Sequence, residues 1–478
     1  MNVDRIKEII EKSPNLSTAL GMHFISTPDD DMCMATMKVD ERNRQPFGFL
    51  SGGASLALAE NLAGVGSSAL CPGKICVGVS VSGDHVKAVQ EAARMGCADK
   101  QLQRRTDFHR SCNQLYYNTQ RKEREEVRSN FAIYRLPEHG LKCCKIECYD
   151  DEILFPGSYA EVGKVEGFVV APFSISSACP LFVLPSEKPS ETDVRDLYLQ
   201  SQSADLQILR TDEQREAYTE DFAKFHDKTK AEDFRKIVLA RKSVLTVDKA
   251  VDEIRIFYRL CLDYPKSFVS LIKTTFAGTW IMATPEILLE GSSKGLHTMA
   301  LAGTRPCMSD SPEPDSCDAL QGWDAKNIKE QQLVADYIMS SLKDSSEAMR
   351  VSGPYTIRYG NIEHIRSDFY FRKNSDTRLG NIVAALHPTP AVCGLPSQAA
   401  LDFILKNEHD DRQYYSGFCG PCHGEGDFHF FVTLRCMKLV GQEIELFAGG
   451  GILPDSDEDE EWNETMMKMQ AMKHCILG

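Results

Sequence analysis

The sequence predicts an α/β protein with a small front region and a large mixed domain behind it. From about residue 132 to the end, strand-like runs rich in β-branched residues alternate with segments of helical periodicity. The chain has 478 residues, 42% of them hydrophobic and 26% charged. This length suggests two or three domains and allows a substantial core without disulfide bonds.

The net charge and the cysteine content limit which partners and which cellular compartment the sequence predicts. The formal net charge of -15 argues against a nucleic-acid partner, because phosphate backbones are bound by clustered Lys and Arg. The 17 cysteines are scattered and odd in number, which favours reduced thiols in the cytoplasm. The first ten residues predict an amphipathic helix rather than a signal peptide. The most apolar stretch, Leu50 to Leu70, contains Glu60 and Asn61, so no membrane partner is expected.

The first 90 residues contain one candidate site, between Gln45 and Glu60. Gly52 and Gly53 lie where a helix should begin, and free N–H groups at a helix start can polarise a carbonyl. Glu60 then falls within a helix of Ala, Leu and Ser. A carboxylate in such surroundings is either paired for a function or faces solvent, and residue types alone leave both open.

This stretch resembles the hotdog-fold acyl-CoA thioesterases, in particular those acting on 1,4-dihydroxy-2-naphthoyl-CoA in menaquinone synthesis. The resemblance implies that Glu60 activates water or attacks the thioester, and that Gln45 and His85 complete the site. It covers residues 1–90 only, with Ser51 where the family often has His, and implies a partial hotdog segment. The segment could instead be a non-catalytic docking module.

Residues 91–131 are predicted to be an atypical linker or a disrupted segment. They show neither the alternation of a strand nor the period of a helix, and residues 91–128 are not expected to form strands. They are more basic than the rest of the chain, but a linker is favoured over a nucleic-acid patch.

The third region, residues 132–478, has clearer elements. Thr211 to Gln214 matches a capping box that would open a helix running towards His226. Residues 234–247 predict a strand with Lys236 on the same face as Val238 and Ala240. On residue type alone, Lys236 is more simply a snorkelling side chain than a buried functional one.

Three glutamates in this region predict a cation site. Glu330 precedes a run of apolar residues at helical spacing and projects on their face, where a carboxylate needs a cation or a hydrogen-bond network. Glu461 and Glu464 are three residues apart at the start of a Met-rich helix and repel each other unless a divalent cation lies beside them. Acidic residues at a helix start are also favoured by the macrodipole alone. Together the three would suit Mg²⁺, which prefers hard oxygen ligands.

Several motifs, in order along residues 132–478, resemble the chorismate-binding enzymes. The resemblance implies stacked β-sheets flanked by helices. The motifs are Lys236–Arg241, Ala283–Glu286, Leu301–Pro306, Glu330–Val334, Leu386–Ala391, Tyr415–Gly417, Thr433–Cys436, Phe447–Gly451 and Glu461–Thr465.

The resemblance also implies roles for single residues. In water-using members a Lys activates water for attack at C2 of chorismate, here Lys236, and a Glu protonates the leaving C4 hydroxyl, here Glu286. A Lys acts as a base only if its pKa falls well below about 10.4, and an acidic Glu needs a raised pKa. Mg²⁺ would be held by Glu330, Glu464 and Glu461. The implied substrate-binding residues are Thr304, His387, Tyr415, Arg435, Gly449 and Gly451.

Two positions favour the water-adding branch, the isochorismate synthases. Anthranilate-forming relatives usually lack Lys where this chain has Lys236, and aminodeoxychorismate synthases usually carry Lys where it has Ala302. The alternative that the chain is a salicylate synthase stays open. The thioesterase-like front segment favours menaquinone synthesis by association, with chorismate as the small-molecule partner and other enzymes of that pathway as further possible partners.

A rival interpretation rests on Cys419 and Cys422, which have the spacing of a thiol–disulfide oxidoreductase. In thioredoxin-like proteins this motif follows a strand and opens a helix, whereas here a turn and a further strand are predicted to follow. With only His423 nearby, the pair is also a poor zinc site.

Overall fold

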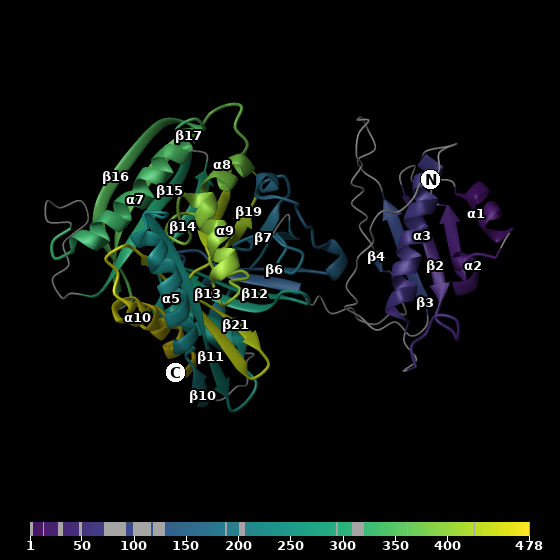
Figure 1. The fold of residues 1–478 in the computed structure, drawn as a ribbon, viewed down its shortest axis with the longest axis horizontal. Coiled ribbons are helices and arrows are strands. Elements are labelled where there is room, and N and C mark those ends of the chain that lie inside the picture. Colours follow the sequence, from purple (N-terminus) through teal and green to yellow (C-terminus); the bar gives the residue numbers. More distant parts are fainter. Residues whose placement is uncertain are drawn as a thin grey trace. The chain divides into compact units, whose positions relative to one another are not determined.

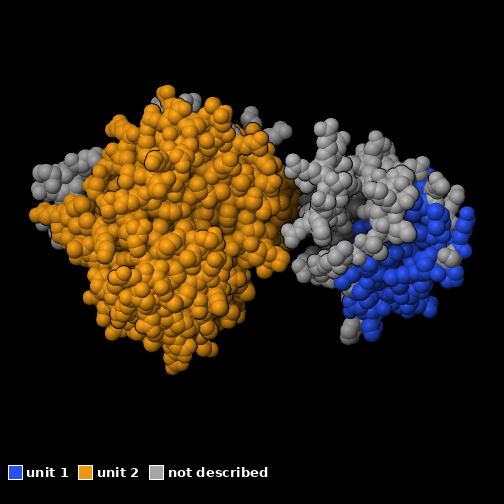
Figure 2. Space-filling model, turned by 45° about the horizontal axis from the view of Figure 1, so that its top comes forward, with its two compact units in different colours: residues 1–127 blue, residues 128–478 orange. Residues whose placement is uncertain are grey.

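The computed structural model divides the chain into two compact units, residues 1–127 and 128–478 (Figure 2). The structure describes residues 3–12, 14–26, 32–46, 50–70, 92–98, 116–117, 130–186, 189–199, 206–292, 295–307, 320–360, 362–424 and 426–477. Within these, no helix has both the length and the apolar composition that crossing a bilayer requires.

Unit 1 is a helix-on-sheet arrangement. Its antiparallel sheet has the order β1-β2-β3-β4, and α3 packs on β2 and β3 (Figure 1). Leu58 and Leu62 of α3 and Phe24 of β1 belong to its core. The elements are α1 (Asp4–Glu11), α2 (Leu16–Leu20), β1 (Met22–Ser26), β2 (Met32–Lys38), α3 (Gly52–Leu70), β3 (Ala92–Ala98) and β4 (Tyr116–Tyr117).

The expectation that residues 91–128 form no strands is therefore wrong. β3 pairs with all of β2, from Met32 opposite Ala98 to Lys38 opposite Ala92. Strands pair through backbone hydrogen bonds, which can form without alternating polar and apolar side chains. This strand lacks that alternation, so it gave no period-2 signal in the sequence.

Unit 2 contains two large sheets that pack face to face. The ten-stranded sheet has the order β10-β11-β22-β21-β13-β12-β5-β6-β9, with β18 also paired to β11 (Figure 1). Its strands are β10 (Ile208–Asp212), β11 (Lys236–Val247), β22 (Glu443–Ile452), β21 (Cys436–Val440), β13 (Gly278–Thr284), β12 (Phe268–Thr274), β5 (Asn130–Arg135), β6 (Lys142–Cys148), β9 (Ser190–Asp193) and β18 (Gly394–Leu395).

The eight-stranded sheet has the order β16-β17-β15-β14-β20-β19-β7-β8. Phe168 and Phe182 of this sheet share a buried cluster with Phe268, Trp280 and Phe447 of the other, which joins the two inner faces. Its strands are β16 (Ser346–Tyr359), β17 (Ile362–Lys373), β15 (Gly295–Pro306), β14 (Ile287–Ser292), β20 (Phe428–Val432), β19 (Phe418–Cys422), β7 (Gly167–Ala171) and β8 (Phe182–Pro185).

Helices cover the outer faces of both sheets. Val334 and Ile338 of α7 pack with residues of α8 on the eight-stranded sheet, and Leu260 of α6 and Met472 of α10 pack on the ten-stranded one. The helices are α4 (Val194–Leu199), α5 (Arg215–Lys230), α6 (Glu253–Asp263), α7 (Ala325–Leu342), α8 (Leu379–Leu386), α9 (Ser397–Asn407) and α10 (Glu458–Leu477), with 3-10 turns at Asp150–Glu152 and Tyr159–Glu161. The predicted α/β class, with stacked sheets and flanking helices, is confirmed.

The predicted capping box at Thr211 is wrong. Thr211 lies in β10, paired with Leu245 of β11, and α5 begins at Arg215 without a side-chain cap. Pairing along β11 holds the segment extended, so the helix starts one turn later than the motif suggests. Glu213, from the same motif, binds Arg241 and Lys473 instead.

The rival redox interpretation has no support in this geometry. Cys419 and Cys422 lie three apart in β19, and their side chains enter different cores on opposite faces of the sheet. Both side chains are buried. They cannot form a disulfide with each other unless the strand is disrupted.

Candidate active site

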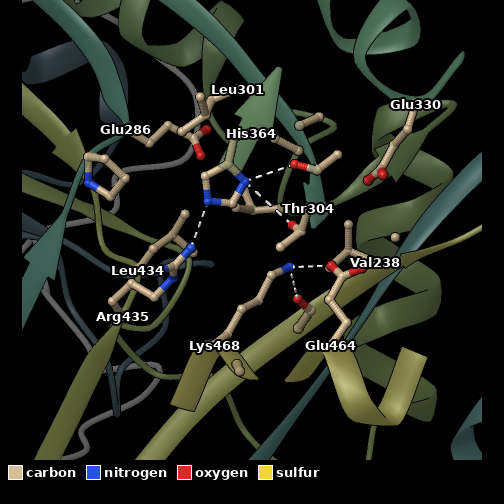
Figure 3. Close-up of a pocket in the computed structure, with 18 of the residues that line it drawn as sticks. Val238, Glu286, Leu301, Thr304, Glu330, His364, Leu434, Arg435, Glu464 and Lys468 are labelled. Atoms are coloured by element: carbon tan, nitrogen blue, oxygen red, sulfur yellow. Dashed lines mark hydrogen bonds and ion pairs between the residues drawn. The ribbon is translucent and has the colours of Figure 1, made fainter. Parts of the chain in front are cut away.

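A pocket in unit 2 lies where β11 and β22 pair beside α7 and α10. Val238 is opposite Gly451 in this pairing, and Ala240 is opposite Gly449. Residues brought together at the pocket from the implied motifs are Glu286, Thr304, Glu330, Tyr415, Arg435, Gly449, Gly451 and Glu464. Figure 3 labels Glu286, Thr304, Glu330, Arg435 and Glu464 among them.

The glycines of β22 make room for the polar groups around them. A Cβ at Gly449 would lie 3.1 Å from the Tyr415 hydroxyl, and one at Gly450 would lie 2.9 Å from Glu461 Oε2. A Cβ at Gly451 would clash with Glu330 Oε1 and lie 2.7 Å from Lys236 Cε. The strand therefore needs glycine at these positions so that the carboxylates can approach its backbone.

Lys236 is fully buried, which excludes the snorkelling interpretation. Its Nζ lies 2.8 Å from Oε1 of Glu330, which projects from α7 as predicted. Burial alone would raise the pKa of Glu330, but the Lys236 ammonium outweighs it and lowers that pKa.

Each of the other two predicted cation ligands is also paired with a lysine. Glu464 Oε1 lies 2.6 Å from Lys468 Nζ, and Glu461 Oε1 lies 2.5 Å from Lys326 Nζ. Burial, with repulsion from Glu464, raises the pKa of Glu461 to about 7. Lys468 points into the pocket and also donates to the Gly449 carbonyl, at 2.8 Å (Figure 3).

These carboxylates fit a Mg²⁺ ion in their chemistry. Within the described ranges, no group of three His, Cys, Asp or Glu side chains is already arranged around one metal position. However, oxygens of both Glu461 and Glu464 face the space over Gly450, at 2.9 and 4.0 Å from the point where a Cβ would lie. Magnesium commonly binds through one or two carboxylates and completes its shell with water and substrate oxygens.

Glu286 follows β13 and lies at the pocket with its side chain buried. Burial raises the pKa of Glu286 to about 8, against the opposing charges of Lys236, Lys468 and Arg435. The carboxyl is therefore mostly protonated at neutral pH and can donate a proton.

His364 and Arg435 form a second polar group in the pocket. Arg435 Nη2 lies 2.9 Å from His364 Nε2, and His364 Nδ1 lies 2.8 Å from the Gly303 carbonyl oxygen (Figure 3). Burial and the Arg435 charge lower the pKa of His364 well below its ordinary value. The neutral ring thus donates from Nδ1 and accepts from Arg435 at Nε2.

His387, expected to bind substrate, is not at the pocket. It is buried with Nε2 3.2 Å from the Pro172 carbonyl oxygen, and its ring packs edge-on against Tyr159 and Phe418. That expectation is corrected: the motif reaches the pocket through Ala391, because its histidine turns into the apolar core.

The sequence did not single out His364, Lys468 or Lys326. Lys468 and Lys326 could have been found by spacing, since each lies four residues from a predicted glutamate, after Glu464 and before Glu330. His364 is a lone histidine in a buried strand, and no periodic signal marks it.

The thioesterase-like residues in unit 1 form no comparable cluster among the residues described there. Glu60 is exposed on α3, which agrees with the solvent-facing alternative, and exposed Gln45 donates to the Leu50 carbonyl at 3.2 Å. His85 lies outside the described residues. Thioesterase activity remains only a prediction.

Known proteins match the sequence and the fold of the larger unit. The model of the chorismate-binding enzyme family matches residues 187–477. This chain belongs to the chorismate-binding enzymes. The match includes every pocket residue named above.

Individual relatives of this chorismate-binding chain are isochorismate synthases by name. Isochorismate synthase EntC of Escherichia coli is 32% identical over 238 residues, 50% of this chain and 61% of the relative. The putative isochorismate synthase MenF of Mycobacterium tuberculosis is 34% identical over 248 residues, covering 50% and 66%. The chain thus spans less than two thirds of the length of either relative.

A solved structure shows the same fold. The putative 2,3-dihydroxybenzoate-specific isochorismate synthase DhbC from Bacillus anthracis superposes with a TM-score of 0.62 at 22% identity, covering 74% of this chain and 97% of the other.

Proposed function

We propose that this chain is an isochorismate synthase, which converts chorismate to isochorismate by adding water at C2 and releasing the C4 hydroxyl. The observation that carries the proposal is that Glu286, buried with a raised pKa, lines the pocket, and that the buried Lys236 is ion-paired to Glu330, which lines the same pocket. A lysine and a protonated carboxyl suit a reaction that needs one proton removed and one supplied. The printed names of the relatives point to the same reaction.

Glu286 supplies the proton for the leaving group. As a carboxyl protonated near neutral pH, it gives its proton to the C4 oxygen, which leaves as water while the ring double bonds shift. One water enters and one leaves, so the product is an isomer of the substrate.

Lys236 activates the entering water. Its Nζ lies in the core 2.8 Å from Glu330 Oε1, which holds the amine beside the pocket that Glu330 lines. The lysine then takes a proton from the water that attacks C2.

The remaining polar groups hold a dianionic substrate. When bound, Mg²⁺ held by Glu330, Glu461 and Glu464 would neutralise the ring carboxylate of chorismate. Arg435, fixed by His364, and the buried Tyr415 would bind the enolpyruvyl carboxylate. We assign the chain to menaquinone synthesis because its front segment resembles a thioesterase of that pathway.

The test is incubation of the full chain with chorismate, with and without Mg²⁺, followed by chromatographic identification of products. Isochorismate formed only with Mg²⁺ is the expected result. Salicylate with pyruvate would move the assignment to the salicylate synthases, and unchanged chorismate from folded protein would refute it.

A further inference from the structure

The two carboxylate oxygens of Glu461 face different surroundings. Oε1 lies 2.5 Å from Lys326 Nζ and 2.7 Å from Ser456 Oγ. Oε2 lies on the side of Gly450, where a Cβ would come within 2.9 Å of it. The carboxylate is therefore held by Lys326 and Ser456 at Oε1, while Oε2 faces the proposed cation position.

The two groups that bind Oε1, Lys326 and Ser456, are themselves fixed in position. Ser456 is buried and its Oγ accepts from the Leu453 backbone N–H at 3.0 Å, so its hydroxyl proton is available to Glu461. Lys326 lies in the first turn of α7, four residues before Glu330. Helix α7 therefore supplies the proposed ligand Glu330 and, one turn earlier, the ammonium of Lys326. That ammonium holds a second proposed ligand, Glu461.

Lys326 and Lys468 occupy different positions relative to the proposed ion. Lys468 binds Glu464 at Oε1, the oxygen that faces Gly450, and points into the pocket (Figure 3). Lys326 binds Glu461 at Oε1, which lies more than 4 Å from a Cβ position at Gly450, and Lys326 does not line the pocket. A cation over Gly450 would have to compete with Lys468 for its oxygen but could share Glu461 with Lys326.

We infer that Lys326, with Ser456, is a positioning residue that orients Glu461 Oε2 for the metal ion and so sets the affinity for Mg²⁺. This inference rests on the proposed function, because it assumes that Glu461 and Glu464 hold Mg²⁺. Removing the ammonium leaves a buried carboxylate held at Oε1 by Ser456 alone and beside the like charge of Glu464. Mutating a residue that orients a metal ligand, without binding the metal itself, typically lowers metal affinity roughly 10- to 100-fold.

The experiment measures Mg²⁺ binding to the full chain by isothermal titration calorimetry, without turnover. We expect Lys326→Met to weaken binding about 10- to 100-fold and Ser456→Ala to weaken it less. Lys326→Arg should restore most of the affinity, because a guanidinium can still donate to Oε1. Lys329→Met, on an exposed position of the same helix, is the matched control and should bind as the unmodified chain does.

The outcomes separate this inference from the proposed function. Unchanged or tighter binding in a folded Lys326→Met variant, checked by circular dichroism, would overturn the inference and leave the metal site standing. Loss of affinity in Lys326→Arg as severe as in Lys326→Met would also overturn it. If the unmodified chain binds no Mg²⁺, the metal site in the proposed function fails, and this inference fails with it.

Discussion

At the scale of single residues, the environment decides which titratable groups can do chemistry. Glu286 and Glu330 are both glutamates at one pocket, yet burial raises the pKa of the first to about 8 whereas Lys236 lowers that of the second. Sequence motifs gave the positions of these groups, but not the ion pair between Lys236 and Glu330. That pair depends on how α7 crosses β11, which no local pattern encodes.

The pH dependence of turnover should report the acid role of Glu286. Because the reaction needs the protonated carboxyl, kcat/KM should fall by about tenfold per pH unit above pH about 8. Glu286→Gln should lower kcat about 100- to 10,000-fold and remove this limb from the profile of its residual activity. A variant that keeps the alkaline limb would show that another group titrates there.

Lys236→Ala should abolish water addition and leave chorismate binding largely intact. Loss of a general base typically lowers kcat about 100- to 10,000-fold. Steady-state kinetics and calorimetric binding of chorismate measure the two effects separately, with Lys242→Ala on the same strand as control. Weaker binding with full turnover at saturation would refute the assignment of Lys236 as the base.

At the scale of elements, a charged network outside the pocket ties β14, β15 and β17 together. His297 Nδ1 lies 2.7 Å from Glu290 Oε1 and its Nε2 lies 2.7 Å from Asp368 Oδ1. Burial opposes the charge on His297, but the hydrogen bonds to Asp368 and Glu290 outweigh it and raise the pKa of His297. The ring thus bridges two carboxylates across three strands, and both carboxylates favour its charged form.

His297→Gln should destabilise the protein by about 3 kcal/mol near pH 6, because it leaves buried carboxylates without their shared cation. Since the pKa of His297 is raised on folding, its contribution is full below pH 6.5 and is lost as pH rises through the folded-state pKa. Urea unfolding across pH 6 to 9 measures this, with exposed His139→Gln as control. A difference between His297→Gln and the unmodified chain that grows with pH would contradict the account.

The sequence predicted elements better than contacts between them. Strand β11 and helix α7 follow the predicted runs because their periodicity is a local property. The capping box at Thr211 failed because pairing with β11 overrode a local motif, and His387 entered the core although its motif borders the pocket. The ion pair of Lys326 with Glu461 was missed because the two residues are 135 positions apart.

At the scale of the whole molecule, the candidate site belongs entirely to residues 128–478. Every pocket residue and the cores that support the pocket lie in that unit, whereas residues 1–127 have a separate core. The family resemblance predicted the stacked sheets of the larger unit. Residues 91–128 were harder to predict, because their strand pairing carries no hydrophobic alternation.

A chain that begins at residue 128 should therefore convert chorismate with kcat/KM within about twofold of the full chain. Its fold should be checked by circular dichroism, and the full chain prepared in parallel is the control. Loss of turnover in a folded fragment would show that residues 1–127 contribute to the reaction.

The central claim, that water enters at C2 as the C4 hydroxyl leaves, is tested most directly by turnover in ¹⁸O-labelled water. Purified chain, chorismate and Mg²⁺ are incubated briefly, and the product is analysed by mass spectrometry with fragmentation to locate the label. The account predicts isochorismate that carries the heavy oxygen at C2. Isochorismate with unlabelled oxygen at C2 would mean that the hydroxyl is transferred within the substrate, which would contradict the roles of Lys236 and Glu286.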